Sequence, residues 1–314
     1  MQDTLALVTD IENLLPLSSA QTIREGIAFF DTVGMPSRNL SARTRVEYHN
    51  DLVDLACFLE RRGKDALRAV GLSDLEAYQA EMDSRGFAPS SRRRKTHTLK
   101  AFFGFLSNQS VLMSNIADRL IPPRSQRREP RWLSEREYKD LLRACSHHPR
   151  DAAIIELFLQ TGLRLSELAA LTLADIELPT KPTPDEDNVG FARVTRKGGS
   201  MGLIPLNHKA CKALKAWTSL RPVCYHDSLF VSKYAAPMSR RAIQATVSRY
   251  LVEAGIRGAS VHSLRHTMAT HHAARGTDIR TLQETLGHAD LATTAMYVSL
   301  AKKAQRRALQ EHAL

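Results

Sequence analysis

Four residues that could act together on a phosphodiester lie within forty positions near the end of the chain. They are His262, Arg265, His288 and Tyr297, in the segment VHSLRHTMATHHAARGTDIRTLQETLGHADLATTAMYVSL. A tyrosine hydroxyl, with an unperturbed pKa of about 10, is a poor nucleophile unless neighbours stabilise the phenolate and the charge on the substrate. Attack by Tyr297 therefore requires further cations and proton carriers from other parts of the sequence.

An earlier arginine, Arg164 in TGLRLSEL, could bind the same phosphate. It follows a glycine and begins a predicted helix, so both its guanidinium and the helix N-terminus could face an anion. His262 and Arg265 are three residues apart in HSLRH and would project from one face of a helix. His288 lies at an apparent helix end, and the short helix that follows could return Tyr297 toward the first histidine and arginine.

The leaving hydroxyl also needs a general acid, and Lys197 is the candidate. It lies at the turn of a predicted β-hairpin, on a long side chain able to reach the minor groove beside a scissile phosphate. Within the turn RKGGSMG, no basic residue follows Lys197. Arg196 remains the alternative, because a strand-register slip of one residue would exchange the faces of the two side chains.

Three sequence boxes resemble the signature boxes of the tyrosine recombinases, the phage-integrase and Xer-like family: TGLRLSEL, HSLRHTMATH and LGHADLATTAMY. The resemblance covers the chain from about Arg131 onward, and the preceding helical half resembles the core-binding domain of that family. It implies site-specific DNA recombination, for integration, excision or resolution. Tyr297 would form a 3′-phosphotyrosyl link and release a 5′-hydroxyl without metal, ATP or any other cofactor.

The resemblance also implies a role for each residue. Arg164 and Arg265 would bind the non-bridging oxygens, and His288 would donate a further hydrogen bond. His262 would act as general base and the hairpin lysine as general acid. Glu167, three residues after the first arginine, matches an acidic position of the family and would orient an active-site side chain.

The pattern of apolar residues predicts a mostly helical α+β protein of two domains. Apolar residues recur every three or four positions from Leu40 to about residue 122, which predicts a small helical bundle. The resemblance implies that 1–122 is a core-binding, SAM-like domain, with 1–39 as a candidate extra N-terminal segment. A proline- and arginine-rich linker spans 123–131. The catalytic domain spans 132–314 and contains a small β-hairpin, formed by GFARVTRK and MGLIPL, and a C-terminal helix.

The charge balance favours a polyanionic partner, since 44 Lys and Arg oppose 33 Asp and Glu and the net charge is +11. A basic run opens one predicted helix of the first domain, where a solvated surface is the alternative to phosphate contact. Two further arginines lie in the linker. The residues predicted to contact DNA are Arg92, Arg93, Arg94, Lys95, Arg127 and Arg128.

Several other classes of protein are disfavoured. The four cysteines are far apart and form no C-x-x-C pair, which argues against a zinc ribbon or a disulfide framework. His262 and His266 have a zinc-ligand spacing, but HSLRH lacks the glutamate of a metalloprotease, so no metal is expected. The acidic N-terminus is unlike a signal peptide and no apolar run reaches 18 residues, so we expect a cytoplasmic protein without a membrane span.

The expected partners are duplex DNA with paired recombination sites and further copies of this chain in a tetramer. The tetramer would form through an apolar face of the C-terminal helix, made of Leu300, Ala304, Ala308 and Leu309. A type IB topoisomerase or hairpin resolvase is the alternative within the same chemistry, and a catalytically silent DNA-binding accessory protein is the alternative of another class. The target sequence cannot be read from the chain, nor can dimer resolution be separated from phage integration, cassette capture or transposition.

Overall fold

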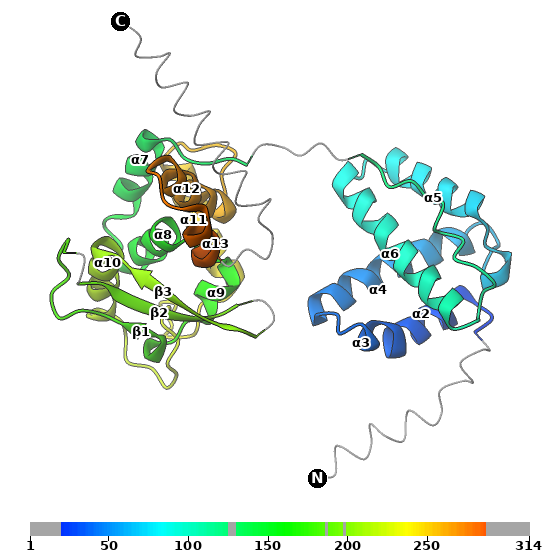
Figure 1. Cartoon of the computed structure of the whole chain (residues 1–314), viewed down its shortest axis with the longest axis horizontal. Coiled ribbons are helices and arrows are strands. Elements are labelled where there is room, and N and C mark those ends of the chain that lie inside the picture. Colours follow the sequence, from blue (N-terminus) through cyan, green and yellow to red (C-terminus); the bar gives the residue numbers. More distant parts are fainter. Residues whose placement is uncertain (1–19, 125–129, 186–187, 197–198, 287–314) are drawn as a thin grey trace, which may run out of the picture. The chain divides into compact units, whose positions relative to one another are not determined.

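The computed structural model describes residues 20–124, 130–185, 188–196 and 199–286, and the chain divides into two compact units, Met1–Arg128 and Glu129–Leu314 (Figure 1). Both units are mainly helical, and the second also contains a three-stranded sheet. This confirms the predicted mostly helical α+β fold. Within the described ranges, no helix combines the length and the apolar character needed to cross a membrane.

The first unit is a bundle of helices around an aliphatic and aromatic core. Its elements are α2 (Ile23–Phe29), the π-helical turn η1 (Phe30–Gly34), α3 (Met35–Ser37), α4 (Ala42–Glu60), the 3₁₀ turn η2 (Leu67–Ala69), α5 (Leu72–Ser84) and α6 (Pro89–Asn108). Phe30 is fully buried, with its ring centroid 5.7 Å from that of Phe102 and 5.3 Å from that of Phe105. Full burial of one such ring contributes about 1.5–3 kcal/mol, so these contacts hold the N-terminal helices on α6.

The second unit alternates helices with a short sheet. Its elements are α7 (Glu135–Cys145), α8 (Pro149–Thr161), α9 (Leu165–Ala170), the 3₁₀ turn η3 (Leu173–Asp175), β1 (Ile176–Glu177), β2 (Gly190–Thr195), β3 (Met201–Leu206), α10 (His208–Thr218), α11 (Arg240–Glu253), α12 (Val261–Ala274) and α13 (Ile279–Leu286). The capping box predicted for SEREYKDLLRAC is present, because the Ser134 and Glu137 side chains each accept from the other's backbone N–H.

Helix α8 is the central helix of the second unit and contacts α7, α10, α11 and α12 (Figure 1). Most of it is buried, with Ile154, Ile155 and Phe158 fully so, as expected for a helix that contacts four others. It ends at Gly162, whose φ of +64° is in the left-handed region that favours glycine. The chain can therefore turn sharply there and begin α9 at once.

The sheet is antiparallel in the order β1-β2-β3. Its β2–β3 pair runs from Gly190 opposite Leu206 to Thr195 opposite Met201, as expected for the predicted hairpin. The structure adds β1, a two-residue edge strand with Ile176 opposite Ala192. Two residues are too few to show an alternating pattern, which explains why the sequence did not predict this strand.

Candidate active site

Arg164 is fixed at the start of α9 by a reciprocal contact with Glu167. One Glu167 carboxylate oxygen accepts from the Arg164 backbone N–H at 2.8 Å, and the other accepts from its guanidinium Nη1 at 2.6 Å. The Glu167 side chain is 6% exposed and that of Arg164 is 32% exposed. The buried carboxylate thus contacts a guanidinium that still reaches the surface, and the orienting role of Glu167 stays a prediction.

Arg265 is held next to Gly162, two residues before Arg164. The Gly162 carbonyl accepts from Nη1 of Arg265 at 2.5 Å, although the two residues are 103 positions apart. A Cβ atom at Gly162 would lie 2.8 Å from a methyl of Leu286 and 3.4 Å from the sulfur of Met268. The ends of α8 and α13 and the middle of α12 therefore converge two residues before Arg164.

Arg265 also forms a hydrogen bond with the last residue of α13. Its Nη2 donates to the carbonyl of Leu286 at 2.6 Å, and the residue is 7% exposed. The final carbonyls of a helix have no intrahelical donor, so a guanidinium is well suited to this position. Carbonyl oxygens carry no formal charge, so these two contacts fix the position of the guanidinium and do not themselves cancel its charge. A guanidinium held in this way is suited to binding a phosphate.

The first turn of α12 presents the histidines. His262 is exposed one turn before Arg265, and His266 is half-buried one turn after His262. The pKa of His266 is lowered by its burial and then by its neighbours His262 and Arg265. His266 is adjacent to Arg265 and one helical turn from His262 on α12, so it lies close to both. The sequence signal for His266 is the i, i+4 spacing in HSLRH, which is also a zinc-ligand spacing.

The described residues hold no group of three or more His, Cys, Asp or Glu side chains able to bind a metal ion. Three predicted site residues, Lys197, His288 and Tyr297, lie outside the described ranges, as do Arg127 and Arg128. The structure therefore places Arg164, Glu167 and Arg265 close together, with His262 one turn from Arg265 on α12, and all the catalytic roles stay predictions.

The basic run at the start of α6 is partly structural. Arg94 forms a bidentate pair with Asp51 on α4, and Lys95 donates to Asp54 at 2.9 Å. Lys95 is 6% exposed and also lies 3.2 Å from a carboxylate oxygen of Asp51. Burial opposes ionisation of Asp54, but hydrogen bonds from Lys95, Tyr78 and Arg85 outweigh it and lower its pKa to about 2. To reach a phosphate, the Lys95 ammonium would have to leave two carboxylates, so burial argues against the predicted DNA contact.

The other two arginines of the run differ from each other. Arg92 pairs with Asp83 at 2.7 Å, and its side chain is 19% exposed. Arg93 is exposed to solvent on the same helix. Arg93 is therefore the member of this run best placed to contact a phosphate.

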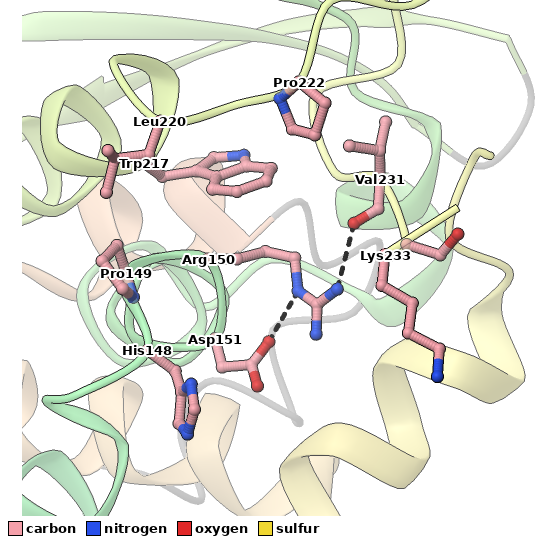
Figure 2. A pocket seen from close by; sticks show the side chains of 10 residues that line it. His148, Pro149, Arg150, Asp151, Trp217, Leu220, Pro222, Val231 and Lys233 are labelled. Atoms are coloured by element: carbon pink, nitrogen blue, oxygen red, sulfur yellow. Dashed lines mark hydrogen bonds and ion pairs between the residues drawn. The ribbon is translucent and has the colours of Figure 1, made fainter. Parts of the chain in front are cut away.

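A pocket with a volume of about 240 Å³ lies at the other end of α8, between Trp217, Pro149 and Val231 (Figure 2). Arg150 crosses it, donating to Asp151 at 2.7 Å and to the carbonyl of Val231 at 3.1 Å. Residues 150 and 162 are separated by twelve helical rises, or about 18 Å. The pocket is thus distinct from the convergence point of the catalytic arginines.

Comparisons with known proteins agree with this geometry. Residues 131–304 match the Phage integrase family, and residues 32–110 match the Phage integrase, N-terminal SAM-like domain. The tyrosine recombinase XerD of Vibrio vulnificus (strain YJ016) is 32% identical over 295 residues, covering 90% of this chain and 93% of the relative. The tyrosine recombinase XerC of Azotobacter vinelandii is 34% identical over 273 residues, covering 84% and 87%.

Two solved structures show the same fold. The XerH site-specific recombinase in a post-cleavage complex with palindromic difH substrate gives a TM-score of 0.72 at 19% identity, covering 90% of this chain and 83% of that one. A lambda integrase(75-356) dimer bound to a COC′ core site gives a TM-score of 0.71 at 17% identity, covering 87% and 97%. The fold is that of these solved structures, and the matching family models and relatives define the class as the phage integrase family of recombinases. The chain belongs to the phage integrase family and is a tyrosine recombinase, as the three sequence boxes predicted.

Proposed function

We propose that this chain cleaves and rejoins duplex DNA at specific sites through a 3′-phosphotyrosyl link at Tyr297. The observation that carries the proposal is the convergence at Gly162, where α8, α12 and α13 meet. It places the buried Arg265 guanidinium beside the segment that presents Arg164. Two fixed guanidinium groups are suited to the two non-bridging oxygens of one phosphate.

In the proposed reaction, the Tyr297 oxygen bonds to phosphorus as the bond from phosphorus to the 5′ oxygen breaks. His262 accepts the phenolic proton, and Lys197 supplies a proton to the departing oxygen. Arg164 and Arg265 stabilise the charge on the phosphoryl oxygens, and His288 donates a further hydrogen bond to them. Rejoining reverses these steps with a different 5′-hydroxyl, so phosphodiester energy is conserved and no external fuel is needed.

The experiment that tests the nucleophile begins with a nicked duplex library whose core is randomised. Covalently captured DNA is recovered and sequenced, which supplies the target site. We expect a covalent adduct through a 3′ end with the wild type, none with Tyr297→Phe, and an undiminished adduct with Tyr225→Phe, a matched change at a fully exposed tyrosine. Undiminished adduct in Tyr297→Phe would refute the assignment.

The two arginines are tested on the recovered site. Arg164→Ala and Arg265→Ala should each slow single-turnover cleavage by about 100-fold or more, since each removes a charge from the transition state. Arg265 also hydrogen-bonds the end of α13, so its loss could lower stability as well as activity. A calorimetric scan of Arg265→Ala measures the change in stability, and Arg265→Lys keeps the charge while changing the geometry of its donors. Cleavage at the wild-type rate by folded Arg164→Ala would contradict its role.

The general acid is tested with a substrate that has sulfur at the 5′ bridging position. A thiolate leaves without protonation because its conjugate acid is far stronger than an alcohol, so this substrate should restore cleavage by Lys197→Ala. Failure to restore it would assign the acid to another residue.

The proposed partner is duplex DNA with two paired sites, on which four copies assemble through the C-terminal segment 300–309. Support for DNA binding comes from the net charge of +11 and from the DNA-bound lambda integrase and XerH neighbours. A cytoplasmic location is proposed with it. Sedimentation of complexes on two-site DNA should give four protomers with the wild type and fewer with Leu309→Asp, while Leu220→Asp, at an exposed leucine of the second unit, should match the wild type.

A further inference from the structure

Arg196 connects the hairpin to the end of α13. It follows the last residue of β2, and its Nη2 donates to the carbonyl of Thr285 at 3.2 Å across 89 positions of sequence. The next carbonyl, that of Leu286, accepts from Arg265 at 2.6 Å. Two guanidinium groups from different elements therefore bind consecutive carbonyls at the C-terminal end of one helix.

This arrangement suits the electrostatics of a helix end. The helix dipole places partial negative charge on the carbonyls of the last turn of a helix. A cation that donates there stabilises the last turn. Because Arg196 comes from the hairpin rather than from α13, the same bond also restrains the hairpin relative to the helix.

The Arg196 side chain packs over Gly202 on the neighbouring strand, β3. A Cβ atom at Gly202 would lie 2.4 Å from Nε of Arg196 and 3.2 Å from its Cζ and Nη2. The guanidinium therefore lies across β3 where there is no side chain. Even a methyl group at Gly202 would displace it.

The backbone of Arg196 is fixed as well. Its N–H donates to the carbonyl of Ser200 at 2.8 Å, and its carbonyl accepts from the N–H of Gly199 at 3.0 Å. Gly199 has a φ of +84°, which permits this tight closure. Arg196 is thus held at the base of the turn that contains Lys197, with its side chain directed to α13.

We propose that Arg196 is a positioning residue, which latches the hairpin bearing Lys197 to the end of α13, two residues before His288. It acts through the helix end rather than on the leaving oxygen. The inference rests on the proposed function for the roles of Lys197 and His288. It favours Lys197 over Arg196 as the general acid, because one guanidinium N–H of Arg196 donates to the Thr285 carbonyl.

Three variants of the full chain test the latch. Arg196→Met removes the guanidinium and keeps the length of the side chain. Gly202→Ala keeps the guanidinium but places a methyl group where the guanidinium lies. Arg193→Met is the matched control, since Arg193 is exposed on the same strand and is not part of the site.

The first measurement is independent of catalysis. Hydrogen exchange of peptides covering α13 should be faster in Arg196→Met and in Gly202→Ala than in the wild type, and unchanged in Arg193→Met. Wild-type exchange in both of the first two variants would overturn the latch, whatever the protein does to DNA.

The second measurement is single-turnover cleavage with oxygen or sulfur at the 5′ bridging position. A displacement of about 1 Å in an active site can slow a reaction about 100-fold, so Arg196→Met and Gly202→Ala should both be slower by about 10- to 100-fold on either substrate. Rescue of Arg196→Met by sulfur would make Arg196 the acid and overturn the proposal. Wild-type cleavage by Gly202→Ala would do so too. Adduct formation by Tyr297→Phe would refute the proposed function instead, and it would leave the exchange result standing.

Discussion

Replacing Gly162 with alanine should destabilise the second unit by more than the same change at Gly255. Both glycines end a helix with positive φ, +64° and +70° respectively. Alanine in that region costs about 1–2 kcal/mol at either position. Only at Gly162 would the new methyl group also meet neighbours, 2.8 Å from Leu286 and 3.4 Å from Met268, whereas nothing lies within 4 Å at Gly255.

The difference between the two variants isolates the packing of α13. Overpacking typically costs about 1–3 kcal/mol, so Gly162→Ala should lose about 2 kcal/mol more than Gly255→Ala. For a unit of this size, that corresponds to a calorimetric midpoint lower by roughly 4–8 °C. Replacing glycine with alanine also lowers the entropy of the unfolded chain, which stabilises both variants equally and cancels in the comparison.

Differential scanning calorimetry of the full chain measures this difference in the transition of the second unit. Single-turnover cleavage provides a second readout, because the Gly162 carbonyl accepts from Arg265 and a shifted backbone would move that guanidinium. Gly162→Ala should therefore also be slower than Gly255→Ala. Equal midpoints for the two variants would refute the contact between α13 and the end of α8.

Three further predictions concern other charged residues. Arg93→Met should weaken binding to random-sequence duplex DNA and reduce its salt slope by about 1 without changing stability. Lys95→Met should instead lower the thermal midpoint of the first unit, because it leaves two carboxylates short of a donor. Weaker DNA binding with an unchanged midpoint in Lys95→Met would contradict the burial of Lys95. The pKa of Asp54 in the folded chain, about 2, is below the unfolded value of about 3.9, and each pKa unit corresponds to about 1.4 kcal/mol. A difference of about 1.9 pKa units corresponds to about 2.6 kcal/mol, and screening by solvent reduces this to about 2 kcal/mol or less. This stabilisation is present above about pH 4 and is lost as the pH falls to about 2. An acid titration of the midpoint should show the loss in the wild type but not in Asp54→Asn. Glu167→Gln should slow cleavage about tenfold or more while costing only about 1 kcal/mol of stability, and an unchanged cleavage rate would mean that other groups orient Arg164.

The sequence alone was enough to predict a phosphodiester-transfer chemistry and which segments form helices and the hairpin. The order of Arg164, His262 and Arg265 within helical boxes, together with the later His288 and Tyr297, was sufficient to indicate a tyrosine recombinase. The helical periodicity of the first domain and the alternation of the hairpin are local patterns, set by 3.6-residue and two-residue repeats. Such features depend on neighbours in sequence, so they can be read without a structure.

Tertiary structure decided what each basic side chain is used for. Lys95 looked like a surface cation in its run of arginines, but its carboxylate partners are on α4, 41 or more positions away. Arg265 and Arg196 bind carbonyls 103 and 89 positions away. The identity of a distant partner is not encoded in local spacing, because it depends on which helix ends the fold brings together. The sequence thus specified the charged groups, and only the packed helices decided which of them are buried, which orient others and which can meet a phosphate.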